Sequence, residues 1–237
     1  VTSITSYRDM ESMTDVDPDG STYRLINLLN TIDQDQFSQE LQLSGLSFDD
    51  RLNWVAGLYY FQEDSFHDSE VSVLLDLRDI IGLDVSSTLN VWSETKNYAA
   101  FGQGTYAITD KLSLTAGLRY THEKKDITRT QFNHSLGIVT VPVDSRSGNW
   151  DAVSGRAGFE YRWSDGAMTY ASVARGFKSG GINGRSRGDN DFLPFDPEFI
   201  WTYEVGLRSD WADNRVRFNA SLFYSDYKDI QFAITLV

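Results

Sequence analysis

Strict alternation of apolar and polar residues is the dominant pattern along the chain. It is clearest in "KLSLTAGLRYTH" (residues 111–122), and it recurs in "WTYEVGLRSD" (201–210) and "VRFNASLFY" (216–224). In the first stretch the apolar positions are Leu112, Leu114, Ala116, Leu118 and Tyr120. A period of two predicts β-strands that have one apolar and one polar face.

The pattern predicts about nine strands, and several of them exceed ten residues. Strands in globular proteins usually have about five or six residues, whereas a strand that crosses a membrane needs about 9–11. The predicted strands are 1–9, 35–45, 51–63, 96–108, 111–124, 150–162, 166–177, 200–210 and 214–228.

The connections between these strands alternate between short and long. "LSFDD", "TD", "SDG" and "ADN" are tight turns rich in Asp, Asn, Ser and Gly, whereas 64–95, 125–149 and 178–199 are long. Tight turns at one end and long polar loops at the other are typical of outer-membrane barrels. A soluble sandwich has no reason to separate its loops in this way.

The polar faces of the strands are charged. Such charges are too costly in a dry core without partners, but they are natural in a wide, wet lumen. The charged positions are Arg119, Arg156, Glu160, Glu204, Arg208 and Arg217. Aromatic residues, Trp150 among them, cluster at predicted strand ends as interfacial girdles do, although aromatics also favour strands in general.

Composition narrows the functional classes. The formal net charge of −13 argues against a nucleic-acid partner, because phosphate neutralisation needs a basic surface. The chain has no cysteine, which excludes disulfides, thiolate metal sites and a cysteine nucleophile. No stretch approaches 18 uninterrupted apolar residues, so the sequence predicts no transmembrane helix.

Little in the sequence indicates catalysis or metal binding. The three histidines, His67, His122 and His134, lack metalloprotease spacing and are expected in exposed outer loops. "DVDPDG" (15–20) begins like a calcium loop, but Ile26 occupies the twelfth position, where a bidentate acid is required. We therefore predict no catalytic residue, no metal ligand and no cofactor.

Four basic residues lie close together in the sequence at the end of one predicted strand, although the chain is acidic overall. The candidate ligand-binding residues there are Arg175, Lys178, Arg185 and Arg187. Their field could attract an anionic ligand, while contact with lipopolysaccharide or simple solvation is the alternative. Residues 71–85 carry apolar residues at mixed helical spacing, which indicates a short helix in an outer loop.

Several stretches resemble the barrel domain of TonB-dependent outer-membrane receptors. The most specific are "RGFKSGG" (175–181), followed by "FDPE" (195–198) and "YEVGLRSDW" (203–211), which are similar to the iron–siderophore receptor branch. The resemblance implies an all-β, antiparallel transmembrane barrel in the outer membrane of a Gram-negative bacterium. It also implies uptake of ferric siderophores or a similar scarce nutrient, with outer-membrane lipid, lipopolysaccharide and TonB as partners and no enzymatic activity.

The resemblance implies that residues 1–237 are one incomplete barrel segment. Members of the family carry a plug inside a 22-stranded barrel, and TonB acts through that plug. No plug segment and no terminal aromatic strand are recognisable here, and nine strands cannot close with the curvature of 22. A small passive porin or adhesion barrel that closes with about nine strands is the alternative.

Overall fold

Nine strands form one antiparallel sheet in the computed structural model, which describes residues 1–82, 85–185, 191–213 and 215–232. Neighbours in sequence are neighbours in the sheet, except that β7 pairs with β10. The strands are β1 (Thr2–Val16), β2 (Ile26–Ser47), β3 (Leu52–Val73), β4 (Val85–Ala107), β5 (Leu112–Asn133), β6 (Ile138–Ser164), β7 (Ala167–Lys178), β10 (Glu198–Trp211) and β11 (Val216–Lys228). Each predicted strand corresponds to one of these.

The strands are much longer than the sequence pattern predicted. β2, β3 and β5 each have 22 residues, and β6 has 27. The predicted long loops 64–95 and 125–149 are therefore wrong over most of their length. Residues 64–73 continue β3, and β5 pairs with β6 almost to the hairpin tip at residues 134–137. At about 3.3 Å per residue, only about half of such a strand is needed to cross a bilayer.

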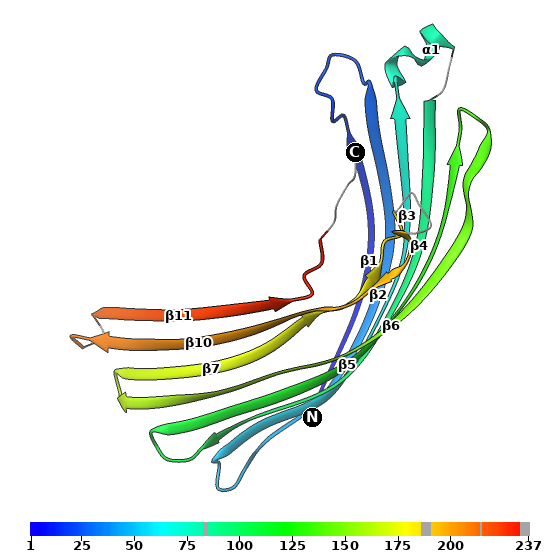
Figure 1. The fold of residues 1–237 in the computed structure, drawn as a ribbon. Helices are drawn as coiled ribbons and strands as arrows, with labels where there is room; N and C mark the ends of the chain where they lie inside the picture. Colours follow the sequence, from blue (N-terminus) through cyan, green and yellow to red (C-terminus); the bar gives the residue numbers. More distant parts are fainter. Residues whose placement is uncertain (83–84, 186–190, 214, 233–237) are drawn as a thin grey trace.

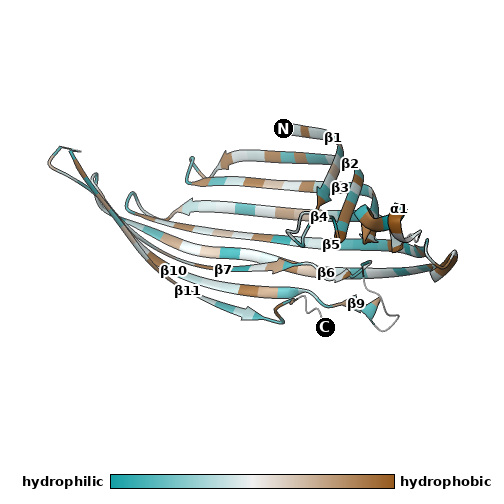
Figure 2. Cartoon of the chain, turned by 90° about the horizontal axis from the view of Figure 1, so that it is seen from above, coloured by the Kyte–Doolittle hydropathy of each residue, from teal (hydrophilic) through white to brown (hydrophobic). Residues whose placement is uncertain are grey.

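The sheet is an open, curved wall (Figure 1). Within the described residues, β1 and β11 each pair with a single strand, so they are the two edges. Brown and teal segments alternate along individual strands (Figure 2), as expected when successive side chains point to opposite faces.

Tight turns lie at one end of the wall, called here the short-turn end, and longer connections lie at the long-loop end. In the β10–β11 turn, Ala212 and Asp213 have φ of 53° and 56°. Two successive left-handed residues are typical of the primed turns that match the twist of paired strands.

The long-loop end carries the small elements. Residues 74–82 contain a 3-10 turn, η1 (Leu75–Leu77), and one helical turn, α1 (Arg78–Ile81), which matches the short helix predicted within 71–85. The β7–β10 connection forms a second, two-stranded sheet from β8 (Gly181–Ile182) and β9 (Pro194–Phe195). No helix among the described residues has the length and apolarity to span a membrane.

Candidate functional site

The two faces of the wall differ in chemistry, and β5 shows the difference most clearly. Leu114, Leu118 and Tyr120 lie on one face and are exposed, Leu118 to 69%. Arg119 and Lys125 lie on the other, because successive side chains of a strand point to opposite faces. We call these the apolar face and the polar face.

A row of aromatic rings bounds the apolar face toward the long-loop end. The ring centroids of Tyr60 and Tyr98 are 5.1 Å apart, and those of Phe37 and Tyr60 are 6.3 Å apart. Beyond this row the same face becomes acidic, and the acidic residues there line a shallow outer groove. They are Asp9, Glu11, Asp33, Asp35, Asp64, Glu94 and Asp126.

A second group of aromatics lies near the short turns. The Phe48 and Tyr106 rings are 6.5 Å apart, and those of Tyr161 and Trp163 are 4.5 Å apart. An exposed apolar band between two aromatic girdles is the signature of a surface in contact with lipid. The exposed apolar band therefore lies along the short-turn half of the long strands, and their other half extends beyond it.

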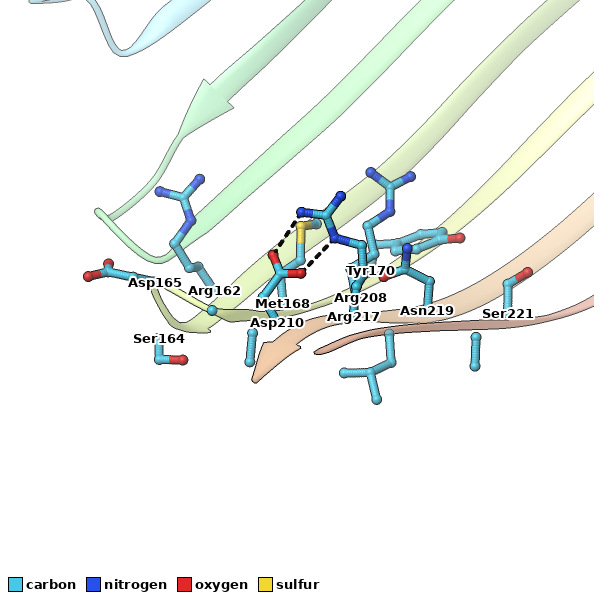
Figure 3. Close-up of a pocket in the computed structure, with 14 residues that line it drawn as sticks. Arg162, Ser164, Asp165, Met168, Tyr170, Arg208, Asp210, Arg217, Asn219 and Ser221 are labelled. Carbon is cyan, nitrogen blue, oxygen red and sulfur yellow. Dashed lines mark hydrogen bonds and ion pairs between the residues drawn. The ribbon is translucent and has the colours of Figure 1, made fainter. Parts of the chain in front are cut away.

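Arginines line a groove on the polar face at the short-turn end (Figure 3), with a volume of about 750 Å³. Arg217 Nε lies 2.6 Å from the Asp210 carboxylate, and the Arg208 guanidinium lies 5.4 Å from the centroid of the Tyr170 ring. Tyr170 donates its hydroxyl to Glu204 at 2.6 Å. Paired and stacked charges of this kind suit a wet lumen or a polar protein surface, not a dry core.

At the long-loop end, the β8–β9 hairpin lies against the polar face of the wall. Ile182 and Phe192 join Val91, Ile127 and Trp150 in the one cluster of buried apolar side chains found in the described residues. Phe192 is fully buried, and its ring centroid lies 4.0 Å from the Arg129 guanidinium and 5.4 Å from that of Arg146. This hairpin is therefore packed against β4, β5 and β6.

Polar contacts hold the base of the hairpin. Lys125 donates to the Gly180 carbonyl at 3.0 Å and forms an ion pair with Glu123 at the same distance. Burial opposes ionisation of Glu123, but the hydrogen bond from the Asn97 side-chain amide and the adjacent Lys125 ammonium lower its pKa. The side-chain amide of Gln231 donates to the carbonyls of Ser179 (2.9 Å) and Asp196 (3.0 Å).

Glycine permits the close approach of this segment to the wall. A Cβ on Gly184 would lie 2.7 Å from Val91 Cγ1, and one on Gly180 would overlap the Trp150 indole. Real Cβ atoms do not approach so closely. The glycine-rich segment after β7 therefore packs against the polar face and does not extend freely into solvent.

The structure separates the candidate cations that the sequence had grouped. Arg175 lies on the apolar face, where it donates to the Val153 carbonyl and its guanidinium lies 4.2 Å from the Phe199 ring centroid. Lys178 ends β7 opposite Glu198. Arg185 follows β8 and contacts His67 on the polar face, with Arg185 Nη2 3.0 Å from each ring nitrogen. Arg187 lies outside the described residues.

The other candidate groups take structural roles. The Asp19 carboxylate accepts the amides of Ile26, Ser21 and Leu25, and the hydrogen bonds from Ile26 and Ser21 hold the pKa of Asp19 well below its usual value. No group of three or more His, Asp or Glu residues in the described part of the chain is placed to hold a metal ion. His67 and His122 belong to strands β3 and β5, so the prediction that they lie in loops is wrong.

Sequence reasoning missed the residues that anchor the hairpin. Trp150, predicted to lie in an interfacial girdle, is 92% buried beneath the hairpin on the polar face, with an exposed fraction of 8%. Arg129 and Phe192 were not identified. The sequence around each residue contains no motif that marks it as an anchor. The two side chains meet only because segments far apart in the sequence pack together.

The family model described as "TonB dependent receptor-like, beta-barrel" matches residues 2–237. The chain belongs to this family. It is therefore part of an outer-membrane β-barrel of Gram-negative bacteria, and the family consists of receptors and transporters rather than enzymes. The polar face is accordingly the lumen side and the apolar face the lipid side.

Individual relatives are similar over part of their length. The pesticin receptor of Yersinia pestis is 33% identical over 147 residues, which is 62% of this chain and 21% of that receptor. The ferric-pyoverdine M114 receptor of Pseudomonas sp. (strain M114) is 27% identical over 134 residues, 56% of this chain and 15% of the receptor. The chain thus spans about a fifth or less of the length of these relatives.

A solved structure shows the same fold. The crystal structure of the ferric yersiniabactin uptake receptor FyuA from Yersinia pestis superposes with a TM-score of 0.81 at 24% identity. The match covers 97% of this chain and 33% of that one. At this level of identity the comparison shows the fold of the wall and nothing about the ligand.

Proposed function

We propose that the complete protein is a TonB-dependent receptor that captures a ferric siderophore or a similar scarce nutrient outside the cell and imports it. Residues 1–237 supply part of the barrel wall and of its outer connections. The observation that carries the proposal is the charged polar face inside a wall of this family, which suits a wide aqueous lumen. The ferric-pyoverdine receptor among its relatives supports the ligand class.

The partners follow from the two faces. The groove at the short-turn end, lined by Arg162, Arg208 and Arg217, would face a plug domain supplied by another part of the protein, through which TonB acts. The apolar band contacts lipid. The acidic surface beyond the Tyr60–Tyr98 row would lie among the headgroups of lipopolysaccharide.

Uptake by cells tests the proposal. The complete gene is expressed in a Gram-negative strain that lacks its own iron receptors, and radioactive iron is supplied as a panel of ferric catecholates, hydroxamates and carboxylates. We expect uptake of at least one chelate, and we expect it to stop when TonB is deleted although binding at the surface persists.

Two results would contradict the proposal. Uptake that continues without TonB would favour the passive barrel. Neither binding nor uptake of any ferric chelate would exclude the ferric ligand class.

A further inference from the structure

The docked hairpin places Arg185 against His67. The two residues are 118 positions apart in sequence, and Arg185 Nη2 lies 3.0 Å from each ring nitrogen of His67. The adjacent Gly184 rests on Val91, which is the register partner of His67 on β4. The same packing that buries Phe192 therefore fixes the position of the Arg185 guanidinium on the lumen side of the wall.

The surroundings leave the charge of Arg185 uncompensated. No carboxylate among the described residues forms an ion pair with it, although the chain carries 34 acidic residues. The residues that face His67 from the neighbouring strands are Ile32 and Val91, both uncharged. Asp68 follows His67 on β3 but points to the opposite face.

The remaining charged group nearby is Arg129, the register partner of Val91 on β5. It is fully buried beneath Phe192 and so is not exposed to the lumen. Arg185, by contrast, is exposed. A guanidinium held by an imidazole rather than a carboxylate keeps its charge and most of its N–H donors available to a ligand.

We propose that Arg185 and His67 together bind an anionic group of the imported ligand, and that His67 takes up a proton from solvent when the anion binds. In the ligand-free protein the Arg185 guanidinium lies against the neutral imidazole, with Nη2 at the same distance from both ring nitrogens. When the anion binds, the unprotonated ring nitrogen takes up a proton from solvent. Both residues then donate to oxygens of the anion, as charge-assisted hydrogen bonds require. This inference rests on the proposed receptor function.

The electrostatics of the ligand-free pair support this coupling. Burial, followed by the positive charge of Arg185, lowers the pKa of His67, and the smaller effect of the Asp68 charge opposes them. The ring is therefore neutral at pH 7, and its unprotonated nitrogen can take up a proton. An anion between the two groups favours the charged imidazole and raises the pKa of His67. By linkage, affinity for the anion rises as the pH falls from neutral and levels off below the pKa of the ligand-free protein.

Binding measurements on the complete receptor test the inference. The probes are a strongly anionic ferric tris-catecholate and a neutral ferric tris-hydroxamate, both labelled with radioactive iron, on cells without TonB so that only binding is read. For an anionic chelate we expect affinity to rise roughly 3- to 10-fold from pH 8 to pH 6. This range corresponds to the uptake of a fraction of one proton by the protein when the anion binds. Affinity for the neutral chelate is expected to change little.

Two variants distinguish the contributions of His67 and Arg185 to anion binding. His67→Gln keeps an acceptor for Arg185 but cannot take up a proton, so its affinity for the anion is expected to be independent of pH. Arg185→Gln is expected to weaken anion binding roughly 5- to 10-fold at both pH values, the loss of one partly exposed charged hydrogen bond. Arg215→Gln, which removes one exposed charge at the short-turn end, is the matched control.

The outcomes distinguish this inference from the proposed function. If the wild-type receptor binds a ferric chelate but both variants bind it equally well at both pH values, the Arg185–His67 site is excluded and the receptor function stands. If anionic chelates are not bound and only the neutral one is, the site is likewise excluded. If the wild type binds no ferric chelate, the ferric-chelate ligand class itself has failed.

Discussion

The guanidinium of Arg129 lies 4.0 Å from the centroid of the Phe192 ring, and solvent reaches neither side chain. Arg146 approaches the same ring at 5.4 Å and pairs with Asp144. Such stacking strengthens when both groups are removed from water. One aromatic residue of the β7–β10 connection therefore fixes the hairpin to two strands of the wall.

Replacing Phe192 by alanine should release the hairpin while leaving the wall intact. A buried Phe→Ala change in a protein core costs about 3–5 kcal/mol, and here the loss falls on a two-stranded element with few other contacts. Hydrogen exchange of the complete receptor should show faster exchange in residues 179–185, with β5 and β6 unchanged. Leu193→Ala is the control, because Leu193 is adjacent but 54% exposed. Equal exchange in both variants would contradict the anchoring role.

Adding a single methyl group to Gly184 should have a similar effect. Its Cβ would lie 2.7 Å from Val91 Cγ1, so the hairpin must move away from β4. Because residues 1–237 contain no cysteine, Ile182→Cys provides a thiol that is unique within this segment and is buried when the hairpin is docked. Labelling of this cysteine by a maleimide should be several-fold faster with Gly184→Ala than without it. Gly102→Ala, where the added Cβ would lie 3.7 Å from its nearest neighbour, should not change the labelling rate.

The sequence predicted the number of strands and their two faces, because alternation is a local property of each strand. It did not predict how far the strands extend. Between the membrane and the hairpin tips, the lipid-side face carries acidic residues, and the β8–β9 hairpin covers part of the lumen-side face. Asp64 and Glu94 there occupy the same face that Leu58 and Ala100 occupy within the bilayer. In this region polar and apolar residues no longer alternate regularly, and the strands were mistaken for loops.

The hairpin anchor could not be predicted for a different reason. Arg129 and Phe192 are 63 positions apart, and their contact depends on the register of β5 and on the path of the β7–β10 connection. The four cations near residue 175 illustrate the same limit. They are close in sequence, but Arg175 and Arg185 lie on opposite faces of the wall.

The apolar band should not tolerate a charge. Leu118→Arg places a guanidinium in the lipid-facing band, which costs about 2–4 kcal/mol near the bilayer midplane. We expect reduced assembly in the outer membrane, measured as loss of the heat-modifiable form of the complete receptor on gels. Thr128→Arg is the matched control, because Thr128 lies on the same strand and the same face, ten residues further on beside the acidic groove. Equal loss in both variants would place the membrane boundary elsewhere.

Asp19 should control the order of the β1–β2 connection. Its carboxylate accepts the amides of Ile26, Ser21 and Leu25, and the hydrogen bonds from Ile26 and Ser21 lower the pKa of Asp19. A lowered pKa in the folded state means that the stabilisation is complete above the ordinary aspartate pKa of about 3.9 and is lost as the pH falls through the lowered value. At neutral pH, Asp19→Ala should therefore expose the loop.

Trypsin at pH 8 can measure this exposure, because Arg24 lies within the connection and its backbone amide donates to Asp76. We expect Asp19→Ala to increase the rate of cleavage after Arg24 several-fold. Asp17→Ala is the control, because the Asp17 carboxylate accepts only the amide of Asp19, at 3.3 Å, among the hydrogen bonds of the described residues. Cleavage that is equally slow in wild type and Asp19→Ala would show that the Arg24–Asp76 ion pair holds the connection without Asp19.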